Sequence, residues 1–228
     1  IFMRYRINEV KLNIDESQER LPRLIEKKLG LKPGSIQQWE LRRRSIDARD
    51  KSDVHFKFTV EFQVEGVTPT TSGRYAKAWK KVSRVGDESM PEPVCGNEEL
   101  TGRPVIVGFG PCGIFAALEL AKRGYKPLVL ERGPAMSDRV RAVENFRTAG
   151  VLDPEGNMLF GEGGAGTFSD GKIGTGIKDG YVRDVLRTFA DAGAGEDIMY
   201  LNKPHIGTDV LRAVIVNLRH KIEELGGE

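Results

Sequence analysis

Several residue types and patterns that mark common protein classes are scarce in this sequence. Its 228 residues include only two cysteines, Cys95 and Cys112, and three histidines that lack ligand-like spacing, so we expect reduced thiols and no metal site. Because no Cys-x-x-Cys pair occurs, the sequence also excludes a disulfide reductase. No apolar run approaches the roughly 20 residues of a membrane-spanning helix. No secretory signal is visible either, so we expect a cytoplasmic protein without a membrane partner.

A strong net charge is also missing, because the whole chain carries only +2. The two halves nevertheless differ: residues 1–90 contain 19 Lys and Arg against 13 Asp and Glu, and the remainder contains 16 against 20. Such an asymmetry suggests two domains with different surroundings. We place an N-terminal domain at 1–85, a linker at 86–103 that is rich in proline and glycine, and a second domain at 104–228.

The N-terminal domain shows the hydrophobic patterns of strands and helices in turn. Residues 3–14 alternate between apolar and polar side chains, as a half-buried strand does. A polar helix start at 15–17 precedes apolar residues at helical spacing up to Gly30. The pattern predicts a small βαββ domain of the α+β class, ferredoxin-like in arrangement. Its further elements are strands at 35–44 and 54–64 and a short basic helix at 75–82.

A basic cluster in this domain offers an alternative function. Arg42, Arg43 and Arg44 follow one another on a predicted strand, where Arg42 and Arg44 would share one face. Basic and aromatic residues on a sheet can bind RNA through phosphate contacts and stacking. We nevertheless expect no nucleic-acid partner, because the charge of residues 1–90 is modest and the glycine and aromatic signature of RNA-binding sheets is missing.

Residues 104–131 carry the most informative pattern in the chain. An apolar run at 105–107, short enough for a strand buried on both faces, leads into Gly108-Phe109-Gly110-Pro111-Cys112-Gly113. A helical pattern follows to Lys122, and a second strand at 127–130 ends at Glu131. This order is the dinucleotide-binding fingerprint, in which glycines allow a tight turn, the approach of a pyrophosphate and close helix packing. The phosphates would bind at the helix N-terminus, and Glu131 would bind ribose hydroxyls, as in FAD or NAD.

A second glycine-rich segment runs from Phe160 to Ile177 and holds seven glycines among its sixteen inner residues. Glycines let a backbone press against a flat or anionic ligand. Thr167, Ser169 and Lys172 add hydrogen-bond donors to this segment. We therefore expect it to contact the same ligand. A helix is predicted at 139–146, and amphipathic helices are predicted at 184–192 and 209–225.

With both glycine-rich segments in this order, the chain resembles bacterial FAD-dependent dehydrogenases that carry an extra N-terminal ferredoxin-like domain. The matching segments are 42–64, 103–133, 160–175 and 203–228. The resemblance implies an α/β fold with a Rossmann-like FAD/NAD(P)-binding domain, and FAD held by the fingerprint glycines and by the loop at 163–172. The candidate cofactor contacts are Gly108, Gly110, Pro111, Cys112, Gly113, Glu131, Arg132, Arg139, Gly163, Gly164, Ala165, Gly166, Thr167, Ser169 and Lys172.

The resemblance also implies that more chain follows in such proteins, including a substrate domain. We therefore expect residues 1–228 to represent an N-terminal part with an incomplete Rossmann-like domain, weak FAD retention and no activity by itself. The function expected for the full protein is an FAD-dependent oxidoreductase acting on an unknown small molecule, with a reduced nicotinamide as one conceivable electron donor. An NAD-binding dehydrogenase is a further alternative. No catalytic residue is assigned, although His205 is the histidine in the most suitable loop.

Overall fold

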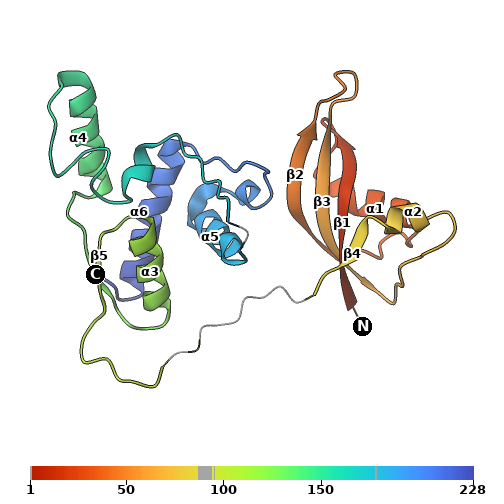
Figure 1. Ribbon diagram of the computed structural model, residues 1–228, viewed down its shortest axis with the longest axis horizontal. Helices are drawn as coiled ribbons and strands as arrows, with labels where there is room; N and C mark the ends of the chain where they lie inside the picture. The colour runs from red at the N-terminus through yellow and green to blue at the C-terminus, as the bar shows by residue number, and fades with distance from the viewer. Residues whose placement is uncertain (1, 87–93, 95, 178) are drawn as a thin grey trace. The chain divides into compact units, whose positions relative to one another are not determined.

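The computed structural model describes residues 2–86, 94, 96–177 and 179–228, and the chain divides into two compact units (Figure 1). The first unit comprises residues 1–91, 178–183 and 199–204, and the second comprises the rest. Cys95 and residues 87–93 of the expected linker lie outside the described residues. Each unit has its own secondary structure.

The first unit is built on an antiparallel sheet with the strand order β2-β3-β1-β4. The apolar positions of β1 and β3 pair across the sheet and are buried, because alternate residues of a strand point to the same face. Helices cover this face, as Trp79 and three apolar residues of the first helix join the same core. The elements are β1 (Phe2–Asn13), α1 (Leu21–Leu29), β2 (Gln38–Asp47), β3 (His55–Glu65), α2 (Ala76–Trp79) and β4 (Val82–Arg84).

The structure corrects two details of this unit. The second strand begins and ends three residues later than the pattern predicted, and α2 is shorter and is followed by β4, which the sequence did not reveal. The sheet edge at β2 also pairs with a distant segment of the same unit: the Arg44 amide donates to the Tyr200 carbonyl over 2.6 Å, and the Asn202 amide donates to the Arg44 carbonyl over 3.2 Å. Only the tertiary fold could bring this segment to the edge of β2.

The arginines of β2 do not alternate as the sequence predicted. The register shifts between Leu41 and Arg43, which marks a β-bulge, and an extra residue in one strand reverses the faces beyond it. The Arg42 Nε lies 3.0 Å from the carboxylate of Glu61. The Arg44 guanidinium instead lies over the ring of Phe56, 5.3 Å from its centroid. Arg42 and Arg44 therefore belong to opposite faces of the sheet.

The second unit contains a small parallel sheet, β5 (Val105–Val107) and β6 (Leu128–Leu130), joined by helix α3 (Pro111–Lys122). The main chain of Glu228 pairs with the other edge of β6: its amide donates to the Pro127 carbonyl, and its carbonyl accepts from the Val129 amide over 2.7 Å. Glu228 thus bonds to the residues before and after Leu128, which is the hydrogen-bond pattern of two parallel strands. The remaining α-helices of the chain are α4 (Met136–Ala149), α5 (Tyr181–Phe189), whose first three residues belong to the first unit, and α6 (Thr208–Glu224).

The core of the second unit lies between α3 and α6. Both helices were predicted from helical periodicity, and each buries one apolar face. Ile114 and Leu118 are the largest fully buried side chains of α3, and Val214 and Leu218 are buried on α6. The molecule thus combines α-helices with one antiparallel and one small parallel sheet. In the described part of the chain, every helix is too short or too polar to span a bilayer.

Candidate functional site

The first glycine-rich segment forms a turn that leads from β5 into α3. Gly108 adopts a φ of +95°, which side chains disfavour, and so allows the sharp change of direction. A Cβ atom on Gly113 would lie 2.0 Å from the carbonyl oxygen of Gly108, so only glycine lets helix and turn pack this closely. Gly110 caps the helix without a side-chain hydrogen bond. Among the described residues, the amides of Gly110, Cys112 and Gly113 have no acceptor.

The second glycine-rich segment packs directly against this turn. The Gly163 amide donates to the Phe109 carbonyl over 2.8 Å. A Cβ atom on Gly164 would lie 3.2 Å from Gly110 Cα, so the two backbones meet with no side chain between them. A short 3-10 helix starts at Ala165, and the amides of the exposed residues Ala165 and Gly166 have no acceptor within the described ranges. The structure therefore brings the two glycine-rich segments together at the N-terminus of α3.

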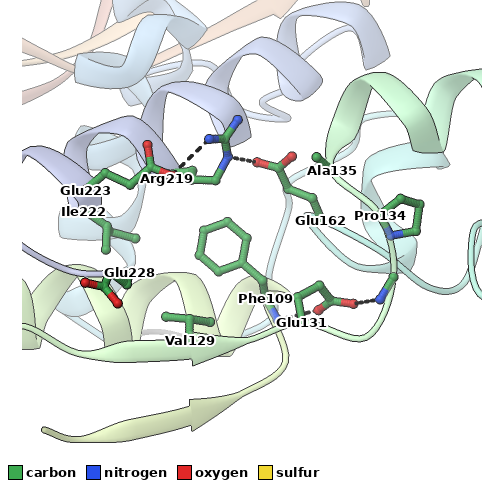
Figure 2. Close-up of a pocket in the computed structure, with 11 residues that line it drawn as sticks. Phe109, Val129, Glu131, Pro134, Ala135, Glu162, Arg219, Ile222, Glu223 and Glu228 are labelled. Atoms are coloured by element: carbon green, nitrogen blue, oxygen red, sulfur yellow. Dashed lines mark hydrogen bonds and ion pairs between the residues drawn. The ribbon is translucent and has the colours of Figure 1, made fainter.

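Glu131 lies at the end of β6 and closes the turn from the other side. One of its carboxylate oxygens accepts from the Phe109 amide over 2.6 Å, and the other accepts from the Gly133 amide over 2.9 Å (Figure 2). Each oxygen retains lone pairs for further donors. Glu131 also borders a cavity of about 200 Å³. Further residues around the cavity are Phe109, Val129, Pro134, Glu162, Arg219 and Ile222.

Glu162 and Arg219 are part of this site and were missed by the sequence analysis. The buried Glu162 accepts from the Met136 amide at the start of α4 over 2.6 Å. It also accepts from Arg219 Nε over 2.8 Å (Figure 2). A carboxylate at a helix N-terminus stabilises the unpaired amides there. Burial acts to lower the pKa of Arg219, but the hydrogen bonds to Glu162 and Glu223 raise it overall. An acid between glycines, Gly161-Glu162-Gly163, was the signal available in the sequence.

Several predicted contacts have protein partners of their own. Arg132 pairs with Glu155, and its guanidinium lies 4.4 Å from the centroid of the Phe160 ring. The hydrogen bond to Glu155 raises the pKa of Arg132. Lys172 lies 2.7 Å from a carboxylate oxygen of Asp170, a contact that raises the pKa of Lys172. Their contact with a cofactor stays a prediction.

The other predicted side chains differ in their exposure. Pro111 and Cys112 are exposed in the first turn of α3, and the Ser169 hydroxyl donates to the Gly166 carbonyl over 2.7 Å. The Thr167 hydroxyl is buried and has no partner among the described residues. Arg139 is fully buried, and its guanidinium binds main-chain carbonyls of the glycine-rich loop. The His205 imidazole, the one candidate base, bonds the Asp170 carbonyl.

Comparisons with known proteins assign no activity to this arrangement. Residues 4–63, which span β1 to β3, match a family described as a domain of unknown function (DUF8436). An uncharacterized protein of Clostridium beijerinckii is 43% identical over 228 residues, which cover 99% of this chain. The chain spans 42% of the length of that relative. The function must therefore be argued from the site.

Proposed function

We propose that this chain binds FAD through its two glycine-rich segments and forms part of an FAD-dependent oxidoreductase. The observation that carries the proposal is the backbone contact between these segments at the N-terminus of α3. There the Gly163 amide bonds the Phe109 carbonyl, and Gly164 approaches Gly110 closely. The two segments meet at a helix end through glycines, which have no side chains, so an anionic group can reach the main chain there.

The groups at this helix end fit a diphosphate. Unpaired amides at the first turn of a helix carry partial positive charge, and the helix dipole adds to it. The amides of Gly110, Cys112 and Gly113 are such donors, and those of Ala165 and Gly166 lie next in the neighbouring loop. Because Gly110 and Gly164 have no Cβ atoms, phosphate oxygens could approach the main chain. We infer that these amides hold the pyrophosphate of the dinucleotide.

Glu131 and the adjoining cavity fit the nucleoside half of the ligand. The carboxylate of Glu131, fixed by two main-chain amides, can accept hydrogen bonds from ribose hydroxyls and would repel a 2′-phosphate. Phe109 and Val129 give the cavity apolar walls, which suit a planar base. This favours FAD or NAD over a phosphorylated nicotinamide dinucleotide. Residues 1–228 contain one such fingerprint, so we assign one dinucleotide to this chain.

The topology supports the corresponding fold assignments. A β5-α3-β6 unit with a parallel main-chain pairing at Glu228 is consistent with a Rossmann-like parallel sheet. The βαββαβ element order and the strand order β2-β3-β1-β4 are consistent with a ferredoxin-like first unit. Together they support the proposed kinship with bacterial FAD-dependent dehydrogenases that have an N-terminal domain of this kind.

The flavin would supply the redox chemistry, and the chain supplies binding and orientation. A small-molecule substrate, a reduced nicotinamide as electron donor and a cytoplasmic location remain parts of the proposal. The His205 ring bonds the Asp170 carbonyl, and its neighbour Lys172 is paired with the Asp170 carboxylate, so we assign no catalytic step to these residues. The proposal therefore ends at cofactor binding and reaction class.

A titration monitored by NMR tests the proposal on this chain. With FAD or ADP added, we expect chemical shift changes at the amides of 108–113 and 163–167 and at Glu131, with FAD bound more tightly than NAD. Replacing Gly110 by Ala should weaken FAD binding by about tenfold or more, since a methyl group would stand where a phosphate must approach. The fold should tolerate this change, because the nearest atom to a Cβ there lies 3.9 Å away.

The matched control is Gly174→Ala in the second glycine-rich segment, where a Cβ would meet no other atom. We expect this variant to bind FAD as the unchanged chain does. Saturating FAD that leaves the fingerprint amides unshifted would refute the proposed site. A clear preference for NAD over FAD would instead identify the site as that of an NAD-binding dehydrogenase.

A further inference from the structure

Arg139 is a buried cation with an unusual set of partners. It lies in the first half of α4 and has no exposed surface. Burying a charge costs free energy unless hydrogen bonds compensate. The structure pairs Arg139 with no carboxylate among the described residues. Its guanidinium donates to five main-chain carbonyls instead, those of Asn157, Met158, Gly161, Glu162 and Gly164, at 2.7 to 3.3 Å.

These five carbonyls belong to one stretch of the loop that approaches α3. The stretch can wrap around a single side chain because three of its glycines have positive φ: Gly161 at +116°, Gly163 at +88° and Gly164 at +70°. A Cβ atom on Gly161 would lie 2.6 Å from Arg139 Cδ. Only glycine at position 161 therefore leaves room for the Arg139 side chain. The loop conformation therefore depends on the guanidinium at its centre.

Fixing the carbonyls also fixes the amides that follow them. In a trans peptide the N–H points away from the C=O of the same unit. Since Arg139 holds the Glu162 carbonyl, the next amide, that of Gly163, points outward and reaches the Phe109 carbonyl. Since it also holds the Gly164 carbonyl, the Ala165 amide is directed away from the arginine and stays exposed without an acceptor in the described structure.

We propose that Arg139 is a positioning residue for the diphosphate of the dinucleotide: it collects the loop carbonyls and thereby presents the Ala165 amide, with the Gly166 amide next along the chain, beside the fingerprint helix. This inference rests on the proposed function and changes the role of Arg139 from a ligand contact to a support of the loop. Arginine suits this task because its planar guanidinium offers five donors in fixed directions.

The surroundings of Arg139 are consistent with a positioning residue that stays positively charged. The centroid of the Phe168 ring lies 4.6 Å from the guanidinium of Arg139 and 4.5 Å from that of Arg212. Burial lowers the pKa of Arg139, while Glu131 and Glu162 act through space to raise it. An arginine with donors to five carbonyls remains protonated at neutral pH. Its positive charge therefore stands directly behind the loop that would face the phosphates.

The test compares Arg139→Ala and Arg139→Lys with the unchanged chain in two measurements. Amide hydrogen exchange without ligand should be faster across 157–166 in both variants, by about tenfold or more, because lysine cannot span the five carbonyls. Binding of ADP and FAD should weaken by about tenfold or more, whereas binding of adenosine, which has no phosphate, should change by less than about twofold. Added guanidinium ion should restore ADP binding to Arg139→Ala.

Arg141→Ala is the matched control, because Arg141 lies on the same helix, is exposed and pairs only locally with Asp138. It should leave exchange and binding unchanged. If Arg139→Ala does not fold, the same comparison is made with Arg139→Lys. Equal losses of ADP and adenosine binding, or unchanged exchange at 157–166, would overturn the role of Arg139 while leaving the FAD site in place. A failure of the unchanged chain to bind ADP or FAD would refute the proposed function itself.

Discussion

Two glutamates of the second unit, Glu131 and Glu162, make similar hydrogen bonds but differ in burial and in ion pairing. Both Glu131 and Glu162 accept hydrogen bonds from main-chain amides, and both line the cavity in Figure 2. Glu162 is 3% exposed and is also paired with Arg219, so its hydrogen-bonding capacity is directed to the protein. Glu131 is only partly buried and has no arginine or lysine partner within the described residues. Glu131 is thus the acid left to interact with a ligand.

The clearest pH dependence at the residue scale belongs to Asp47 at the end of β2. Hydrogen bonds from Arg49 and then from Lys57, which lies 2.7 Å away, hold the pKa of Asp47 well below its ordinary value. Because the folded-state pKa is depressed, the stabilisation is fully present above the unfolded-state pKa of about 3.9. It is lost as the pH falls from there through the folded-state pKa. A carboxyl titration by NMR should show Asp47 still ionised at pH 3.9.

Arg49→Gln provides the comparison for this titration. Removing the guanidinium takes away the largest influence on Asp47, so the midpoint should move upward toward the ordinary value. Arg49 is mostly exposed, so the fold should be unaffected. A midpoint that is ordinary in the unchanged chain, or identical in both proteins, would contradict the assigned pairing.

At the scale of elements, α1 shows how local signals and packing combine. The Ser17 side chain accepts from the Glu19 amide just before the helix, and Gly30 ends it in the left-handed conformation with a φ of +70°. A Cβ atom on Gly30 would also lie 2.4 Å from the ring of Tyr75. The glycine is therefore required by the helix end and by the packing of the segment before α2.

Gly30→Ala should lower the free energy of unfolding by about 2 kcal/mol, since alanine at positive φ costs about 1 kcal/mol and the aromatic ring must also move. Gly34→Ala is the control, because Gly34 has a φ of +80° but nothing near its Cβ position. Gly34→Ala should lower the free energy of unfolding only by the cost of alanine at positive φ, about 1 kcal/mol. Chemical denaturation of the two variants measures the difference. Equal losses in the free energy of unfolding would show that the Tyr75 ring moves aside at no cost.

The strand β5 departs from its sequence-based prediction in one respect. Its apolar residues indicated a strand buried on both faces, yet Val105 is 58% and Val107 84% exposed. The expectation was wrong because α3 packs on the face of β5 that carries Ile106, whereas the face that carries Val105 and Val107 is left uncovered by the described residues. Exposed apolar side chains on a strand favour association with other surfaces.

At the scale of the whole molecule, the distribution of charge bears on the alternative of nucleic-acid binding. Arg4, Arg6 and Arg42 all approach the buried carboxylate of Glu61, and Arg4 and Arg42 also lie within ion-pair distance of Glu40. Arginines engaged in this way offer less charge to phosphates than the sequence suggested. The net excess of 19 basic over 13 acidic residues in 1–90 is unchanged by this pairing, but these three guanidinium groups are turned toward carboxylates of the sheet.

We expect single-stranded RNA to bind this chain no more tightly than the roughly 10⁻⁴ M that marks weak non-specific binding at physiological salt. Fluorescence anisotropy over a salt series measures it. Tighter binding that falls steeply and linearly with the logarithm of salt concentration would favour the nucleic-acid function instead. Arg43→Ala, which changes an exposed arginine of β2, would then show whether the sheet carries the binding.

The sequence by itself determined the main elements and the first half of the site. Alternation predicted β1 and β3, helical periodicity predicted α1 and α6, and glycine spacing predicted the turn before α3, because these signals arise from neighbours along the chain. Glu131 followed from its place at the end of β6. Local patterns of this kind involve few residues and do not depend on how the rest of the chain is arranged.

Only the tertiary structure decided how separate segments meet. The bulge that separates Arg42 from Arg44, the pairing of Arg44 with Tyr200 and the five carbonyls around Arg139 all join residues distant in sequence. No periodicity encodes such contacts, because they depend on backbone geometry and on which polar groups must find partners once buried. For that reason Arg139 could be listed as a cofactor contact from sequence, whereas its bonds point to a role in shaping the loop.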